Sequence, residues 1–168
     1  MIGRMRFLPR TSLALAAYLG VACAGSNFDG RVYHQGEIHV RFDEVPSEWR
    51  QIDVTDTALA FRDDAASSTI LFNGRCGKDA SDVPLASLRQ HLFLHFTERQ
   101  IDAEELIGLD GREALVTHLV AKLDGVLKHF VVVIIKKDGC VYDMIRVAPR
   151  AGDDPGFTRF YRGFSTID

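Results

Sequence analysis

The sequence lacks the short motifs that mark the common nucleotide-binding, hydrolytic and zinc-binding folds. It contains no Gly-rich phosphate loop, no Gly-x-Ser-x-Gly element and no paired Cys motif for zinc. The acidic pairs Asp63-Asp64 and Glu104-Glu105 match no recognisable catalytic carboxylate dyad. These absences argue against an enzyme and against a bound cofactor, so we expect a protein that binds other molecules without catalysis.

The chain also lacks an excess of positive charge. Its formal net charge is −3, and residues 1–22 contain three arginines but no acid. The remainder therefore has 17 basic and 23 acidic side chains, a formal charge of −6. Such a surface repels a phosphate backbone, so we expect no nucleic-acid partner. An apolar content of 46% is ordinary for a single packed domain of this length.

No apolar run is long enough to cross a bilayer as a stable helix. Residues 11–22 form a short apolar segment that follows the arginines and precedes small residues, which predicts a secretory signal peptide over residues 1–22. Its end, Leu19-Gly20-Val21-Ala22-Cys23, resembles the lipobox of bacterial lipoproteins, although Gly stands where Leu is usual. The resemblance implies lipidation of Cys23, with plain cleavage before this residue as the alternative.

A lipidated N-terminus would fix the mature protein to a membrane. Each buried methylene contributes about 0.8 kcal/mol, so a multiply acylated Cys23 stays in its bilayer. Ala24, where Asp would favour the inner membrane, favours the outer membrane on the lipoprotein resemblance. Residues 23–36 contain several glycines and are predicted to be a flexible tether. Residues 37–168 are then a single domain in the bacterial cell envelope, facing the periplasm.

Cysteine is scarce, and this scarcity makes its pairing informative. If Cys23 carries lipid, only Cys76 and Cys140 remain, and the export signal places them in an oxidising compartment. Both are expected at strand ends, so we predict a disulfide between them that contributes about 2 to 4 kcal/mol. Two buried thiols are the alternative, and neither residue has the surroundings of a catalytic cysteine.

Three Asp-Gly pairs, spaced 14 residues apart, organise the region 101–147. They are Asp110-Gly111, Asp124-Gly125 and Asp138-Gly139. An Asp-Gly pair between apolar runs predicts a two-residue hairpin turn, because both central residues need positive φ. Four consecutive antiparallel strands follow, in which Leu109 faces Arg112, Leu123 faces Val126 and Lys137 faces Cys140.

This register assigns the meander residues to two faces, both apolar enough to be covered. One face is predicted to carry Leu106, Leu115, Leu119, Phe130, Val132, Ile134, Ile145 and Val147. The other is predicted to carry Val116, Val120, Leu127, Val131, Val133, Ile135, Tyr142 and Met144, together with Glu105, His118, His129 and Arg146.

The remaining periodicities predict further strands at 38–42, 49–54, 58–62 and 69–72 and two helices that pack on the sheet. One helix begins at Pro84, with Asp82 as a possible cap and an apolar stripe that extends to Phe96. The other follows Asp153-Asp154-Pro155, and its aromatic residues recur at helical spacing. We therefore predict an α+β fold with an antiparallel sheet of about six to seven strands flanked by helices.

Several motifs resemble those of a known fold. The segment Val45-Pro46-Ser47-Glu48-Trp49 after an opening strand, the Asp-Gly turns and the terminal Gly163-Phe164 look like the PsbP-like α/β/α sandwich. Asn73-Gly74-Arg75-Cys76 and the residues around Asp110-Gly111 and Asp138-Gly139 are similar to an uncharacterised family of proteobacterial lipoproteins. The resemblance implies a non-enzymatic accessory or assembly factor and carries over no catalytic residues.

Few polar side chains can be grouped into a candidate site. On the predicted register, Glu105, His118, His129 and Arg146 are diagonal neighbours that could line a small ligand-binding or anion-binding cleft; a solvated end of the sheet is the alternative. His91 and His95, spaced four residues apart on the first helix, are a weak metal-site candidate because no third ligand is near. Asp143 is a candidate buried acid that could bond a helix terminus.

The leading hypothesis is a non-enzymatic adaptor for an envelope protein partner, which needs an exposed apolar or charged patch. The second is a carrier of a small amphiphile or lipid, with a cavity lined by Phe93, Val131, Val133 and Met144. The third is an enzyme or metal site that uses Glu105, His118 and His129.

Overall fold

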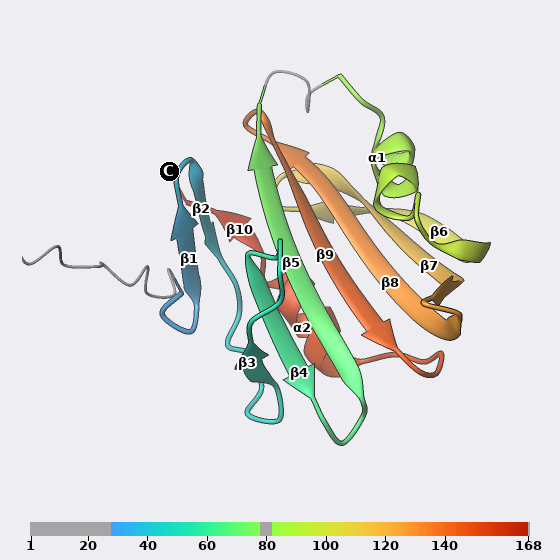
Figure 1. Ribbon diagram of the computed structural model, residues 1–168. Coiled ribbons are helices and arrows are strands. Elements are labelled where there is room, and N and C mark those ends of the chain that lie inside the picture. Colours follow the sequence, from blue (N-terminus) through green and yellow to red (C-terminus); the bar gives the residue numbers. More distant parts are fainter. Residues whose placement is uncertain (1–27, 78–81, 168) are drawn as a thin grey trace, which may run out of the picture.

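The computed structural model describes residues 28–77 and 82–167, which form two antiparallel sheets and two helices (Figure 1). The large sheet has seven strands in the order β3-β4-β5-β9-β8-β7-β6. They are β3 (Arg50–Ile52), β4 (Leu59–Asp63), β5 (Ser68–Cys76), β6 (Thr97–Leu109), β7 (Arg112–Leu123), β8 (Val126–Lys137) and β9 (Cys140–Ala148). The small sheet, β1-β2-β10, contains β1 (Val32–Gln35), β2 (Ile38–Arg41) and β10 (Ser165–Thr166). The helices are α1 (Leu85–Leu92) and α2 (Pro155–Arg162).

The three Asp-Gly pairs form the turns of the β6–β9 meander. Each Asp has φ between 48° and 52° and each Gly has φ between 72° and 78°, so both central residues are left-handed, as a type I′ turn requires. The pairs Leu109–Arg112, Leu123–Val126 and Lys137–Cys140 close the turns, which confirms the predicted register. The sequence therefore correctly assigns the residues of β7, β8 and β9 to their faces.

The first of these turns also holds the small sheet in place. The Asp110 carboxylate accepts hydrogen bonds from Lys137 Nζ at 2.8 Å, from the Thr166 backbone N–H at 2.8 Å and from Thr166 Oγ1 at 2.9 Å. Burial alone would raise the pKa of Asp110, but these donors outweigh burial and hold the pKa below its ordinary value. Asp110 thus connects the β6–β7 turn to β8 and β10.

The two helices lie on opposite faces of the large sheet (Figure 1). α1 packs on β7 and β8, and its Leu88 is 6% exposed. The core on this side, which we call the α1 face, also contains Phe93, Leu119, Ala121, Phe130, Val132, Ile134 and Val141. Burial of each large side chain of this kind stabilises the fold by about 1.5 to 3 kcal/mol.

The opposite face, which we call the α2 face, carries the larger core. The predicted aromatic stripe of α2 is buried there as Phe157, Phe160, Tyr161 and Phe164. The Phe160 ring stacks on Phe42 at a centroid distance of 4.3 Å. Asp154 is the N-cap of α2, and its Oδ1 accepts the Phe157 backbone N–H at 3.0 Å. The predicted acidic start of this helix is confirmed.

α1 is shorter than the sequence pattern predicted. The apolar stripe extends to Phe96, but the helix ends at Leu92, and residues 93–95 form a turn. The Phe93 carbonyl, at the C-cap, accepts a hydrogen bond from the Arg99 guanidinium at 3.0 Å. Phe93 and Phe96 still pack on Phe130, with ring centroids 5.1 and 5.3 Å away. The apolar spacing that predicted a longer helix therefore reflects a buried turn after the helix. The N-cap of α1 is Pro84, without a side-chain cap.

The prediction of a flexible tether over residues 23–36 is wrong for its second half, which is folded. Val32–Gln35 forms β1, which pairs with β2 in a register that joins Gln35 to Ile38. Tyr33 is buried at 4% exposure, and the Phe28 ring meets Phe61 edge-on at 5.7 Å. The packed domain therefore includes residues 28–36. Cys23, the predicted signal peptide and the start of the tether lie outside the described residues.

Candidate functional site

The predicted polar group on the α2 face has the expected strand positions. His118 faces Ala103 and Val131, and His129 faces Val120 and Ala148, so the two histidines are diagonal across β7 and β8. Both are partly buried, whereas Glu105 on β6 is exposed. The register thus places the three residues near one another, as predicted, on a part of the α2 face that is partly open to solvent.

Arg146, the fourth predicted member, is occupied by structural contacts. Its Nε donates to Asp154 Oδ2 at 2.9 Å and to Ser68 Oγ at 3.1 Å, and its Nη1 donates to the Gly152 carbonyl at 3.1 Å. Its side chain is 10% exposed. Arg146 therefore ties β9 to the start of α2, and the predicted anion-binding role has no support in the structure.

The weak metal-site candidate is not assembled. His91 is on α1, but His95 lies in the turn after the helix ends, so the two do not share a helical face. Both side chains are exposed. Within residues 28–77 and 82–167, no cluster of three His, Cys, Asp or Glu side chains could hold a metal ion.

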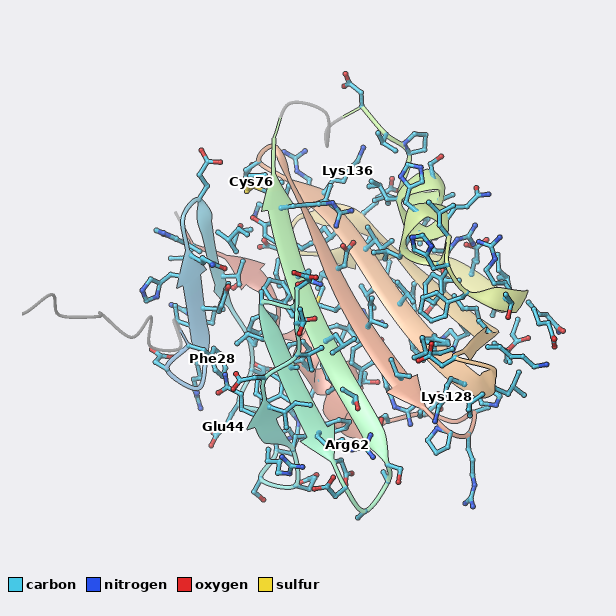
Figure 2. The ribbon with its side chains drawn as sticks, in the orientation of Figure 1. Phe28, Glu44, Arg62, Cys76, Lys128 and Lys136 are labelled. Carbon is cyan, nitrogen blue, oxygen red and sulfur yellow. A yellow bond between two sulfur atoms is a disulfide. The ribbon has the colours of Figure 1, made fainter. Side chains whose placement is uncertain are left out.

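The predicted disulfide is present. Cys76 and Cys140 are directly opposite each other at one end of β5 and β9, and their sulfurs are bonded. Figure 2 shows Cys76 at this end of β5. These two strands are neighbours in the sheet although 64 residues separate the cysteines in the sequence. The disulfide therefore fastens the β3–β4–β5 part of the sheet to the meander.

Asp143 is buried as predicted, but its partner is a strand residue rather than a helix terminus. Its side chain is 1% exposed and pairs with the Arg75 guanidinium on the neighbouring strand β5. Its Oδ1 has no hydrogen-bond partner among the described residues. Burial raises the pKa of Asp143 above its ordinary value, and the Arg75 charge offsets only part of that rise.

Asp143→Asn is therefore expected to gain stability relative to the native protein as the pH rises. The folded-state pKa is raised, so the carboxyl contributes its full stability below the unfolded pKa of about 4 and loses it as the pH rises through the folded pKa. Asn does not ionise, so in urea unfolding the variant should be favoured more at pH 7 than at pH 4. The exposed Asp53→Asn serves as the control; a difference that does not change with pH contradicts the prediction.

The surface grooves do not match the predicted carrier cavity. A groove of about 300 Å³ lies between α1 and the margin of the sheet and is lined by Phe93, Arg99, Ile101 and Leu119, among others. Phe93 belongs to the core of the α1 face, whereas Val131, Val133 and Met144 pack in the core of the α2 face. The sheet separates Phe93 from Val131, Val133 and Met144, so the four residues cannot line one cavity.

The most exposed structured element is β6, at the outer margin of the large sheet (Figure 1). All ten residues from Thr97 to Leu106 are exposed, including the apolar Ile101 at 47% and Leu106 at 60%. We call this element, Thr97–Leu109, the β6 edge. Its acidic residues are Glu98, Asp102, Glu104 and Glu105.

The sequence predicted the β6 strand but not its exposure. Leu106 was assigned to a core face, and the register does place it opposite Leu115. However, α1 packs on β7 and β8, so nothing in the described chain covers Leu106. The acidic side chains on both sides of the strand, such as Glu104 and Glu105, were the sequence signal for an exposed edge.

Comparison with known proteins identifies the fold. No family model and no curated protein matches the sequence. Among solved structures, the chain is similar to cyanobacterial PsbP (CyanoP) from Synechocystis sp. PCC 6803, with a TM-score of 0.58 and 12% identity over 87% of this chain and 98% of that one. It is also similar to LpqN of Mycobacterium tuberculosis, with a TM-score of 0.50 and 18% identity over 82% of this chain and 90% of that one.

A third similar structure is a larger protein from Bacteroides thetaiotaomicron VPI-5482. The TM-score is 0.57 and the identity 10%, and the match covers 84% of this chain but 50% of the Bacteroides protein, so the chain spans about half of its length. At such low identities the likeness defines the fold alone, and that fold is PsbP-like, as the sequence motifs predicted. Neither helix in the described part of the chain is long and apolar enough to span a membrane.

Proposed function

We propose that this protein is a lipid-anchored accessory domain of the bacterial cell envelope that binds another envelope protein and has no catalytic role. The observation that carries the proposal is the β6 edge, which exposes Ile101 and Leu106 beside four carboxylates. An adaptor needs an exposed surface of this kind. LpqN, which shares the fold, is involved in cell envelope biogenesis, and this is consistent with an accessory role.

The lipid anchor is part of this proposal. Membership in the uncharacterised proteobacterial lipoprotein family, with Cys23 acylated in the outer membrane, rests on the sequence resemblance. Four residues lie between Cys23 and Phe28, the first residue that the structure describes, and the five steps from Cys23 to Phe28 can span at most about 18 Å. An acylated Cys23 would therefore hold the domain close to the membrane surface, within reach of membrane proteins and their periplasmic segments.

The proposal is tested by crosslinking in intact cells that express the full-length chain. We expect a reproducible protein partner, and we expect the double variant Ile101→Asp/Leu106→Asp to reduce its crosslinking about tenfold, because truncating or charging apolar anchors disrupts binding. The matched control is Val126→Asp/Leu127→Asp, which charges two similarly exposed residues at the start of β8. Mass spectrometry of the N-terminal peptide measures the acylation of Cys23.

Two results would contradict the proposal. An unmodified Cys23 in the membrane fraction would contradict the proposed lipid anchor. A stoichiometric lipid bound to the purified protein, without any crosslinked protein, would instead identify a carrier.

A further inference from the structure

We propose that the β6 edge binds an extended basic segment of the partner as an eighth strand of the large sheet. This inference rests on the proposed function and specifies how the partner is held. An edge strand presents unpaired backbone N–H and C=O groups, and an extended segment can pair with them. In the described residues β7 is the single strand neighbour of β6.

The backbone groups available for pairing follow from the turn geometry. The two-residue turn Asp110-Gly111 makes Leu109 and Arg112 a hydrogen-bonded pair. Alternation along the strand then directs the backbone groups of Ile107 and Glu105 toward β7. The backbone N–H and C=O groups of Glu104, Leu106 and Gly108 consequently point away from the sheet, where an added strand would meet them.

Only part of β6 is a regular template. The register is continuous from Ala103 to Leu109, whereas it shifts between Thr97 and Gln100 and again between Ile101 and Ala103. Bulges disrupt pairing, so the docking segment is residues 103–109. Seven residues exceed the usual strand length of about five to six, which is enough for a full added strand.

The other sheet edges are unsuitable by comparison. Among the described strands, β3 at the opposite margin has three residues, and the edges of the small sheet have four and two residues. Natural proteins protect long edges with charged side chains, especially lysine, with proline or with bulges. Residues 103–109 contain no lysine, proline or bulge; their charges are Glu104 and Glu105, and Leu106 in the middle is 60% exposed.

The charge of β6 favours a basic partner. Glu104 already pairs with Arg89 and Glu98 with Lys122, but no ion pair in the described structure engages Glu105. Glu105 points toward the α2 face and Leu106 toward the α1 face, because successive strand residues alternate. An added strand therefore fits best with a basic residue beside Glu105 and an apolar residue beside Leu106. A second copy of this chain would instead bring four further carboxylates to the edge.

The test uses the folded protein and a capped nonapeptide of alternating Lys and Val, with a Glu/Val peptide of the same length as the control. Hydrogen exchange by NMR should show new protection of the Glu104, Leu106 and Gly108 amides on addition of the Lys/Val peptide. The Glu105 and Ile107 amides should be protected with or without it. Leu106→Pro removes an outward N–H without removing a ladder bond, and should weaken peptide binding about tenfold.

Several outcomes overturn the inference. They are no new protection at saturating Lys/Val peptide in the native protein, equal binding of the Glu/Val peptide, or a dimer that protects the same amides without peptide. The first measurement needs no variant, so it remains decisive if Leu106→Pro fails to fold. Partner crosslinking that survives in a folded Leu106→Pro protein overturns strand addition but leaves the proposed function standing. Absence of any crosslinked partner from the native chain overturns the proposed function itself.

Discussion

Asp154→Ala is expected to lower the free energy of unfolding by about 4 kcal/mol. Asp154 has two structural roles: Oδ1 caps α2 through the Phe157 N–H, and Oδ2 accepts a hydrogen bond from Arg146. The side chains of Asp154 and Arg146 are 12% and 10% exposed, so the ion pair is largely buried. Loss of the cap costs about 1 kcal/mol, and an unpaired buried guanidinium costs about 3 kcal/mol more.

Two further variants separate these contributions. Asp154→Asn keeps an oxygen that can cap the helix but removes the charge, so we expect a loss of about 3 kcal/mol in urea unfolding. Adding Arg146→Leu to Asp154→Ala removes the uncompensated charge and should restore part of the lost stability. A loss below about 1 kcal/mol for Asp154→Ala would mean that Arg146 is satisfied by Ser68, Gly152 and water alone.

The meander could be predicted because its signals are local. A two-residue Asp-Gly turn fixes the pairing of the residues on either side, and strand alternation then propagates the assignment along the whole hairpin. This is why the partners of Leu109, Leu123 and Lys137 were all correct. The N-cap of α2 at Asp154 is another local signal, since a carboxylate before Pro155 satisfies the first N–H groups of the helix.

Features set by tertiary packing could not be predicted from the same patterns. An apolar spacing such as that of Leu92 and Phe96 suits either a continuous helix or a turn that follows a helix. Contact with Phe130 decides between them. β1 has only four residues, one of which, Tyr33, is buried against the main core, and its glycine-rich surroundings resemble a tether. Short strands of this kind form because a core is already available to cover them.

The surroundings of the candidate site residues could not be predicted from the sequence for a related reason. The register brought His118 and His129 together as expected, but it could not show that Ser68, Gly152 and Asp154 would occupy Arg146. Likewise, strand pairing placed Leu106 on the α1 face without showing how far α1 would extend over it. β6 lies at the margin because β5 pairs with β9, at the other end of the meander. That pairing joins segments far apart in the sequence, so local patterns do not predict it.

Removal of the Cys76–Cys140 disulfide is expected to lower the free energy of unfolding by about 4 kcal/mol, a large share of the total for a domain of this size. The cysteines are separated by 64 residues, so the crosslink removes much of the closure entropy of a long loop from the unfolded chain. Urea unfolding of the native protein with and without reductant measures the effect. Cys76→Ala/Cys140→Ala is the control, because reductant should not change its stability.

The disulfide should act on stability without being required for the fold. β5 and β9 are joined by eight register pairs, and the completely buried Ile70, Phe72 and Met144 pack at this junction. These contacts persist when the sulfurs separate, so the reduced protein should keep native-like NMR spectra in the absence of urea. Loss of those spectra on reduction would show that the native β5–β9 junction itself depends on the covalent link. Unchanged stability on reduction would show that the unfolded chain already holds the two segments together, and that the loop-entropy account does not apply here.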